Sequence, residues 1–289
     1  MKKKINSIFD VITLVKPRIT LLTLITACAG LHLAPGNANW ALWLHTLIGT
    51  AFLVGGANAL NMFIERDTDL LMTRTQDRPL PGKRLSPEFV LGFGSLLIGL
   101  AVPWLSYFVN PLTGALGALS VVSYVLFYTP LKRKTSLALW VGAVPGAMPP
   151  LLGWAAVARS VDLPALILFL IIFFWQVPHF LAIGIFRREE YAKAGIKILT
   201  LEKTSRHIKF QSAFYAGLLL PTSVSLYFLK VAGSLYLVTA LVLGLVFFIY
   251  ACLGFRSQNE LRWSKRLFLI SLVYLTVLYG VLFVDGGGL

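Results

Sequence analysis

Four polar side chains suited to holding a metal ion recur along one segment of the sequence. Asn58, Asn61, Glu65 and Asp69 are spaced by three, four and four residues. If a helix continues to Asp69, this spacing places all four on one helical face, while Asp67 points elsewhere. Amide and carboxylate oxygens without His or Cys suit a hard cation, and Mg²⁺ typically takes one or two carboxylates and completes its shell with water and substrate phosphates. The pattern therefore favours a Mg²⁺-binding face.

Basic residues follow this face directly in the sequence. Four cations, Arg74, Arg78, Lys83 and Arg84, stand within the next fifteen positions after Asp69. Because guanidinium and ammonium groups bind phosphate oxygens, cations beside metal-binding carboxylates predict a diphosphate site. A solvated helix end followed by an ordinary basic loop is the alternative, and the spacing by itself leaves both readings open.

The elements that must position these groups are membrane helices. Of the 289 residues, 57% are hydrophobic and 13% are charged, whereas a soluble domain carries roughly 25% charge. Apolar stretches near the roughly 20 residues that span a bilayer recur about nine times. They lie at about 19–35, 40–63, 89–109, 112–130, 137–157, 163–186, 210–229, 232–255 and 267–284. We predict an all-α, polytopic membrane protein in which residues 1–289 form a single transmembrane domain.

The basic residues are distributed unevenly among the predicted loops. Net charge is +14, and all but two of the 26 Lys and Arg fall on the N-terminus, which includes Lys2, Lys3 and Lys4, or follow even-numbered helices. Only Arg159 and Lys230 lie on the other side. The positive-inside rule then predicts a cytoplasmic N-terminus, an external C-terminus and a site that faces the cytoplasm. Since this topology explains the charge, we expect the lipid bilayer and not nucleic acid as the partner.

The first polar segment resembles a signature of the membrane prenyltransferases. It has an Asn, an acid–Arg pair four residues on, a further Asp and then Arg-Thr-x-x-Arg-Pro-Leu at 74–80. Further segments at 128–133, 146–154, 175–180 and 187–195 resemble, in order, one branch of the UbiA-type superfamily. That branch is the protoheme IX farnesyltransferases, or heme O synthases. The motifs extend from the second helix past the sixth, about half of the chain, so the resemblance implies a UbiA-like bundle.

The resemblance also implies an activity and roles for single residues. The reaction would transfer a farnesyl group from farnesyl diphosphate to a vinyl group of heme b, with addition of water, at the cell inner membrane. Asn61, Glu65 and Asp69 would hold Mg²⁺, and Lys132 would complete the catalytic set. The candidates for binding substrate are Asn58, Arg66, Arg74, Arg78, Lys83, Tyr128, Arg133, His179, Arg188, Glu190 and Lys193. Downstream partners would be a heme A synthase or oxidase assembly proteins.

The loop after the sixth helix departs from the wider superfamily. Most relatives carry a second Asp-rich motif there for a second Mg²⁺, whereas this chain has Glu189, Glu190 and Tyr191 followed by the basic Lys193 and Lys197. The resemblance therefore implies one Mg²⁺, with cations doing part of the work of a second. A helix end that merely meets solvent is the alternative reading of the two glutamates.

Two features of the middle helices have several readings. His179 follows Pro178, and it could ligate heme iron, donate a hydrogen bond near the site or satisfy a backbone carbonyl freed by the proline. Pro149 and Pro150, flanked by glycines, predict a break in the fifth helix and a close approach of neighbouring helices.

Two other functions fit parts of the pattern. A prenyltransferase of the same fold could act on an aromatic or quinone precursor, but the missing second Asp-rich motif and residues 177–180 argue against it. A membrane transporter would place polar residues near the midplane of several helices. Because the polar groups gather at one end of the predicted helices, an enzyme is favoured.

Overall fold

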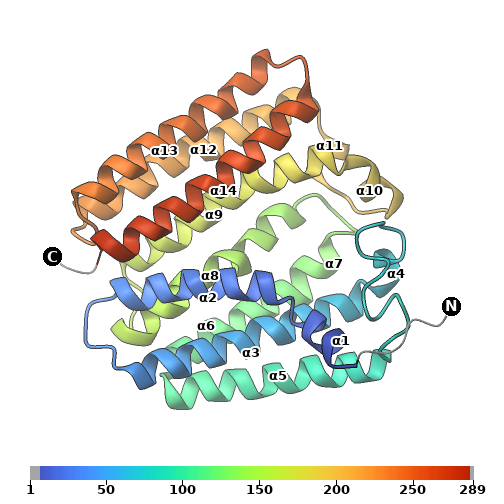
Figure 1. The fold of residues 1–289 in the computed structure, drawn as a ribbon, viewed down its shortest axis with the longest axis horizontal. Coiled ribbons are helices and arrows are strands. Elements are labelled where there is room, and N and C mark those ends of the chain that lie inside the picture. The colour runs from blue at the N-terminus through green and yellow to red at the C-terminus, as the bar shows by residue number, and fades with distance from the viewer. Residues whose placement is uncertain (1–6, 287–289) are drawn as a thin grey trace.

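Long apolar helices make up most of the computed structural model, which describes residues 7–286 (Figure 1). Lys2, Lys3 and Lys4 therefore lie outside the described residues. Each of the nine predicted segments has a helical counterpart. These are α2 (Pro17–Leu33), α3 (Trp40–Ile64), α5 (Pro87–Phe108), α6 (Pro111–Val121) with η1 (Val122–Tyr128) and α7 (Thr129–Leu131), α8 (Ala138–Ala158), α9 (Leu163–Phe186), α12 (Ser205–Phe228), α13 (Ser234–Leu253) and α14 (Glu260–Asp285). The all-α class is confirmed, and within residues 7–286 the only β pairing is an isolated bridge.

The helices differ in how clearly they qualify as membrane spans. Within the described range, seven are long and apolar enough to cross a bilayer by length and composition. Helix α2 is apolar but has only 17 residues. Helix α12 has 24 residues, but Ser and Thr side chains along it make it more polar than the seven helices that qualify. The chain is therefore a multi-pass membrane protein, and nine remains an approximate count.

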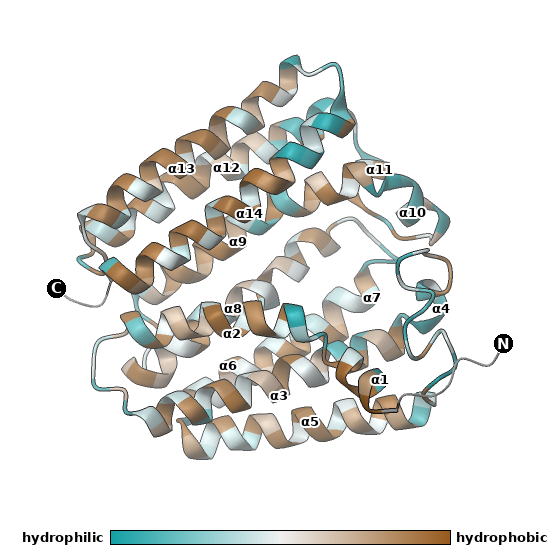
Figure 2. Cartoon of the chain, in the orientation of Figure 1, coloured by the Kyte–Doolittle hydropathy of each residue, from teal (hydrophilic) through white to brown (hydrophobic). Residues whose placement is uncertain are grey.

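Polar segments gather at one end of the bundle. Brown, apolar residues predominate along the long helices, and teal, polar residues concentrate near α4, α10 and α11 (Figure 2). These short helices span Arg66–Asp69, Arg188–Lys193 and Leu199–Glu202, and α1 (Ser7–Leu14) lies at the same end. The final turn of α14 lies at the opposite end, as an odd number of crossings requires. Which end faces the cytoplasm, and whether residues 1–289 form one domain, remain predictions.

Helices α2 and α8 cross with their backbones in close contact. A Cβ on Gly30 would meet the carbonyl oxygen of Pro150, and a Cβ on Gly153 would meet that of Ala27. Small residues allow membrane helices to approach in this way and gain van der Waals packing. The predicted close approach around the Pro-Pro pair is therefore confirmed.

The predicted break at this pair is wrong. Helix α8 continues without interruption through Pro145, Pro149 and Pro150, all three of which lie inside it. A proline removes an N–H donor, but membrane helices tolerate that loss where neighbouring helices enclose the backbone. Helix α8 packs against both α2 and α9, so neighbouring helices enclose its backbone in this way.

Candidate active site

The four polar side chains at positions 58, 61, 65 and 69 share one face in the structure, although the helix that carries them is interrupted. Glu65 joins α3 to α4, and its backbone N–H donates to the carbonyl of Asn61 at 2.9 Å. The N–H of Asp69 donates to the carbonyl of Glu65 at 2.8 Å, so the helical repeat continues across the junction. Asn58, Asn61, Glu65 and Asp69 consequently all line one cavity of about 680 Å³. Asp67 points away, with 75% of its side chain exposed.

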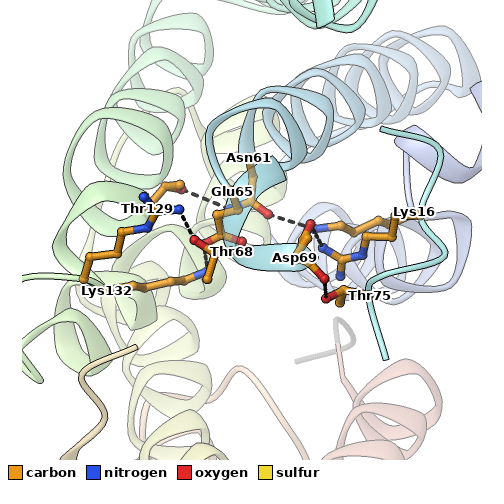
Figure 3. A network of polar contacts seen from close by, with 10 residues as sticks. Lys16, Asn61, Glu65, Thr68, Asp69, Thr75, Thr129 and Lys132 are labelled. Carbon is orange, nitrogen blue, oxygen red and sulfur yellow. Dashed lines mark hydrogen bonds and ion pairs between the residues drawn. The ribbon is translucent and has the colours of Figure 1, made fainter. Parts of the chain in front are cut away.

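Both carboxylates of this face are paired with cations. Lys132 Nζ lies 2.7 Å from Glu65 Oε1, and Arg78 Nη1 lies 2.7 Å from Asp69 Oδ2. The other oxygen of Asp69, Oδ1, is buried and has no hydrogen-bond partner among the described residues. Glu65, Lys132 and Asp69 lie close together in one network of polar contacts (Figure 3). One oxygen atom of Asp69 therefore has no protein partner.

The amide of Asn61 links three segments. Its Oδ1 accepts a hydrogen bond from Lys16 Nζ at 3.1 Å, and its Nδ2 donates to Thr129 Oγ1 at 3.2 Å (Figure 3). Lys16 precedes α2 and has a left-handed backbone, with φ of 47°. Burial, together with repulsion from Arg78 and Lys132, lowers the pKa of Lys16 to about 7. A non-glycine residue in this conformation at a binding site indicates that the surrounding fold holds it there.

Charge neutralisation explains how the buried carboxylates remain in place. Burial by itself would raise the pKa of Glu65, but Lys132, Lys16 and Asn61 together outweigh that effect and lower it. Burial would lower the pKa of Lys132, but nearby Tyr128 and Glu65 raise it above its ordinary value. For Asp69, burial raises the pKa, and Arg78 only partly opposes the rise. Glu65 and Lys132 are therefore both ionised at neutral pH.

The cavity has two chemically different regions. Its polar end collects the carboxylates together with cations from four loops or helix ends. These cations are Lys16, Arg74, Arg78, Lys132, Arg187 and Lys197. The rest of its wall is mainly apolar and aromatic and includes Leu139, Ile172, Trp175, Phe180, Phe268 and Leu275. Such a cavity suits a ligand with an anionic head and a large apolar body.

The donor set at the polar end fits Mg²⁺. Two carboxylates and the Asn61 amide face the cavity from adjacent turns, and Asp69 Oδ1 has no partner. Among residues 7–286 no group of three or more His, Cys, Asp or Glu could hold a metal ion. A Mg²⁺ ion here would take only the one or two carboxylates that this ion commonly uses, with substrate phosphates as its other ligands.

Seven of the residues predicted to bind substrate, His179 among them, do not line the cavity. The guanidinium of Arg66 lies over the ring of Phe63, 4.7 Å from its centroid. Arg133 contacts Thr68 and lines a smaller neighbouring cavity. Glu190 forms an ion pair of 2.8 Å with Arg187. The remaining three, Lys83, Arg188 and Lys193, are exposed to solvent.

One cation of the polar end was not singled out from the sequence. Arg187 stands next to the predicted Arg188 in the chain, yet it is Arg187 that lines the cavity. Lys197, named with Lys193 as a cation that would do part of the work of a second metal, lines the cavity as well, whereas Lys193 does not. Tyr124 also lines it, within the π-helical segment η1. The wider turn of a π-helix shifts the register of the residues that follow, and no pattern in the sequence announces it.

Tyr128 and His179 occupy different positions relative to the wall. The ring of Tyr128 lies 4.3 Å from Lys132 Nζ and lines the cavity. His179 lies behind the wall, because its ring stacks on Trp175 at 4.6 Å and its Nδ1 lies 2.7 Å from Ser271 Oγ. Contact between His179 and heme remains a prediction.

The fold and the site together define a class. Membrane helices that enclose an apolar cavity, closed at one end by carboxylates and cations, form the architecture of a membrane prenyltransferase. The chain belongs to the UbiA prenyltransferase family, whose model matches residues 23–273. It is 51% identical over 242 residues to a protoheme IX farnesyltransferase of Sorangium cellulosum. The aligned region covers 82% of this chain and 85% of the relative.

Solved structures share the fold at low sequence identity. One, from work on digeranylgeranylglyceryl phosphate synthase in membranes, has a TM-score of 0.84 and 16% identity, with 98% of this chain and 99% of that chain covered. A UbiA homolog from Archaeoglobus fulgidus, bound to GPP and Mg²⁺, has a TM-score of 0.66 and 15% identity, with 94% and 99% covered. The predicted UbiA-like bundle is thereby confirmed.

Proposed function

We propose that this enzyme transfers the farnesyl group of farnesyl diphosphate to a vinyl group of heme b, with addition of water, and releases heme O and diphosphate. The observation that carries this proposal is the 51% identity, over most of both chains, to a relative named protoheme IX farnesyltransferase. The two-region cavity supports it, because farnesyl diphosphate has an anionic head and an apolar tail and heme is largely apolar.

We further propose one Mg²⁺ at the polar end, held by Asn61, Glu65 and Asp69. The unpartnered Oδ1 of Asp69 supports this assignment, as does the relative solved with GPP and Mg²⁺. When bound, the ion would neutralise negative charge that builds on the leaving diphosphate. The cations Arg187 and Lys197 reach the same cavity where a second metal would otherwise serve, which supports one ion and not two.

The side chains of this enzyme would promote departure of the diphosphate mainly by electrostatics. Arg74, Arg78 and Lys132 surround the polar end and would bind diphosphate oxygens. Their charge favours the transition state, in which the bond between carbon and diphosphate oxygen is breaking, more than the intact substrate.

Orientation and partners complete the proposal. The basic loops support a cytoplasm-facing polar end, so that farnesyl diphosphate would enter from the cytoplasm and heme b from the bilayer or its interface. The product would pass to a heme A synthase or to oxidase assembly proteins. Arg66, Lys83, Arg133, Arg188, Glu190 and Lys193 lie off the cavity wall, so any role in substrate binding would require them to act from its rim.

The test is an assay of the purified protein in detergent with heme b, farnesyl diphosphate and Mg²⁺. We expect heme O by mass spectrometry and release of diphosphate in equal amount. Omitting heme, and replacing it with an aromatic or quinone precursor, are the controls. Prenylation of such a precursor with no heme product would overturn the substrate assignment, and absence of any prenylated product would overturn the activity.

A further inference from the structure

Gln176 is a buried polar residue in an otherwise apolar part of the cavity wall. It stands on α9 between the wall residues Ile172 and Phe180 and is only 5% exposed. A buried amide in apolar surroundings is costly unless its hydrogen bonds are satisfied. Its partners therefore show which way the amide points and which atom is left for a ligand.

The amide nitrogen of Gln176 has both of its hydrogens bound. Nε2 donates to the carbonyl of Ala143 at 3.1 Å and to the carbonyl of Ile172 at 3.2 Å. Since both partners are acceptors, the nitrogen and not the oxygen must face them. Oε1 accepts no hydrogen bond from the described residues and points toward Gly146, where a Cβ would collide with it. Gly146 and Gln176 both line the cavity, so this oxygen lies at the cavity wall.

This oxygen lies close to the position expected for the reacting carbon. The ring of Tyr128, beside Lys132 Nζ, fits against Gly142, where a Cβ would meet the ring. Gly142 and Gly146 are four residues apart on α8 and share one face. Gln176 Oε1 therefore lies about one helical turn, or ~6 Å, deeper than the ring that packs on the diphosphate-binding lysine. In a bound prenyl diphosphate, the carbon bonded to the diphosphate would lie at about the same depth in the cavity as this oxygen.

We infer that Gln176 orients the water molecule that adds to the heme, an inference that rests on the proposed function. As the carbon–oxygen bond to diphosphate breaks, the vinyl π electrons form a bond to the farnesyl carbon and leave a cation on the other vinyl carbon. A water that donates one hydrogen bond to Gln176 Oε1 directs a lone pair to that cation. A carbon–oxygen bond forms, one water O–H bond breaks and its proton passes to the released diphosphate.

The proposal predicts a change of product and not only of rate. A cation that is not captured by water loses a proton and gives an alkene, which is lighter than heme O by one water. In Gln176→Leu, which keeps the volume but removes the acceptor, we expect the ratio of heme O to alkene to fall about two- to tenfold, as loss of one hydrogen bond between neutral groups predicts. Diphosphate release should continue.

A second variant tests the same oxygen without removing it. In Gly146→Ala the new methyl group displaces Oε1, and the ratio should fall in the same direction. Gly99→Ala is the matched control, because a Cβ at Gly99 meets nothing within 4 Å, and its ratio should equal that of the unchanged enzyme. Isotope-labelled water would identify the origin of the hydroxyl oxygen in each product.

The outcomes separate this inference from the proposed function. If the unchanged enzyme makes no heme product, the proposed function fails. If it makes heme O, and Gln176→Leu and Gly146→Ala give the same ratio as it does, Gln176 does not orient the water. Loss of diphosphate release in folded Gln176→Leu would place the residue in binding or ionisation and would likewise overturn the inference.

Discussion

Lys132 Nζ lies 2.7 Å from Glu65 Oε1, although the two residues are 67 positions apart in the sequence. Glu65 ends α3 and Lys132 follows α7, so the contact joins two separate walls at the polar end of the cavity. Both side chains are mostly shielded, with 19% of Lys132 and 13% of Glu65 exposed. A diphosphate that binds Lys132 would weaken this pair and free a carboxylate oxygen for a metal.

The carboxylates of the metal-binding face should be essential for diphosphate release. In Glu65→Gln or Asp69→Asn we expect Mg²⁺-dependent release to fall by about a hundredfold or more, the typical effect of removing one major electrostatic contributor. Asp67→Asn is the matched control, because that side chain is exposed and points away from the cavity. Undiminished release from folded Glu65→Gln would remove Glu65 from metal binding.

Removing Lys132 should affect stability and activity separately. Lys132→Met leaves Glu65 buried without its partner, and we expect a loss of about 2–3 kcal/mol in the free energy of unfolding. Thermal unfolding in detergent measures this loss. Adding Glu65→Gln should recover more than half of it, because an uncharged amide does not need a cation. Neither variant should release diphosphate at an appreciable rate.

The double variant also distinguishes a structural from a catalytic ion pair. If the pair served only stability, the double variant would regain activity together with its Tm. We expect the Tm to return without activity, because Lys132 is also needed for the diphosphate. Recovery of both quantities would contradict its proposed role in catalysis.

Much of the fold could be predicted from the sequence because bilayer thickness sets helix length. All nine segments have helical counterparts, and 163–186 coincides with α9. The shared face of Asn58, Asn61, Glu65 and Asp69 could also be predicted from the sequence. Spacings of three and four keep side chains on one face even though α3 ends at Ile64, since the backbone hydrogen bonds continue to Asp69.

The rest depended on contacts between distant segments. Charge alone could not separate Arg187 from Arg188, since which of two adjacent residues faces a cavity depends on how α9 ends and α10 begins. Pro150 suggested a broken helix, but packing against α2 preserves α8. Gln176 became informative only when its amide partners were known, because sequence shows a polar residue but not the direction of its oxygen.

The crossing of α2 and α8 should be sensitive to one added methyl group. In Gly153→Ala the new Cβ meets the backbone oxygen of Ala27, which cannot move aside as a flexible side chain could. We expect a loss of about 1–3 kcal/mol in the free energy of unfolding, the usual cost of overpacking. Gly280→Ala, where a Cβ meets nothing within 4 Å, is the control and should unfold at nearly the original temperature.

The orientation in the membrane can be tested with two single cysteines, because the two ends of the bundle each offer an exposed position. Asp67 lies at the polar end of the bundle. Lys230 is exposed in the loop between α12 and α13 at the far end, where the N–H of Gly233 donates a hydrogen bond to the carbonyl of Asp285. With Cys28 and Cys252 replaced by alanine, a membrane-impermeant maleimide should label Lys230→Cys in right-side-out vesicles and Asp67→Cys only in inside-out vesicles. The reverse labelling pattern would place the carboxylates and their surrounding cations outside the cell, where cytoplasmic farnesyl diphosphate could not reach them. That result would contradict both the predicted topology and the proposed route of the substrate.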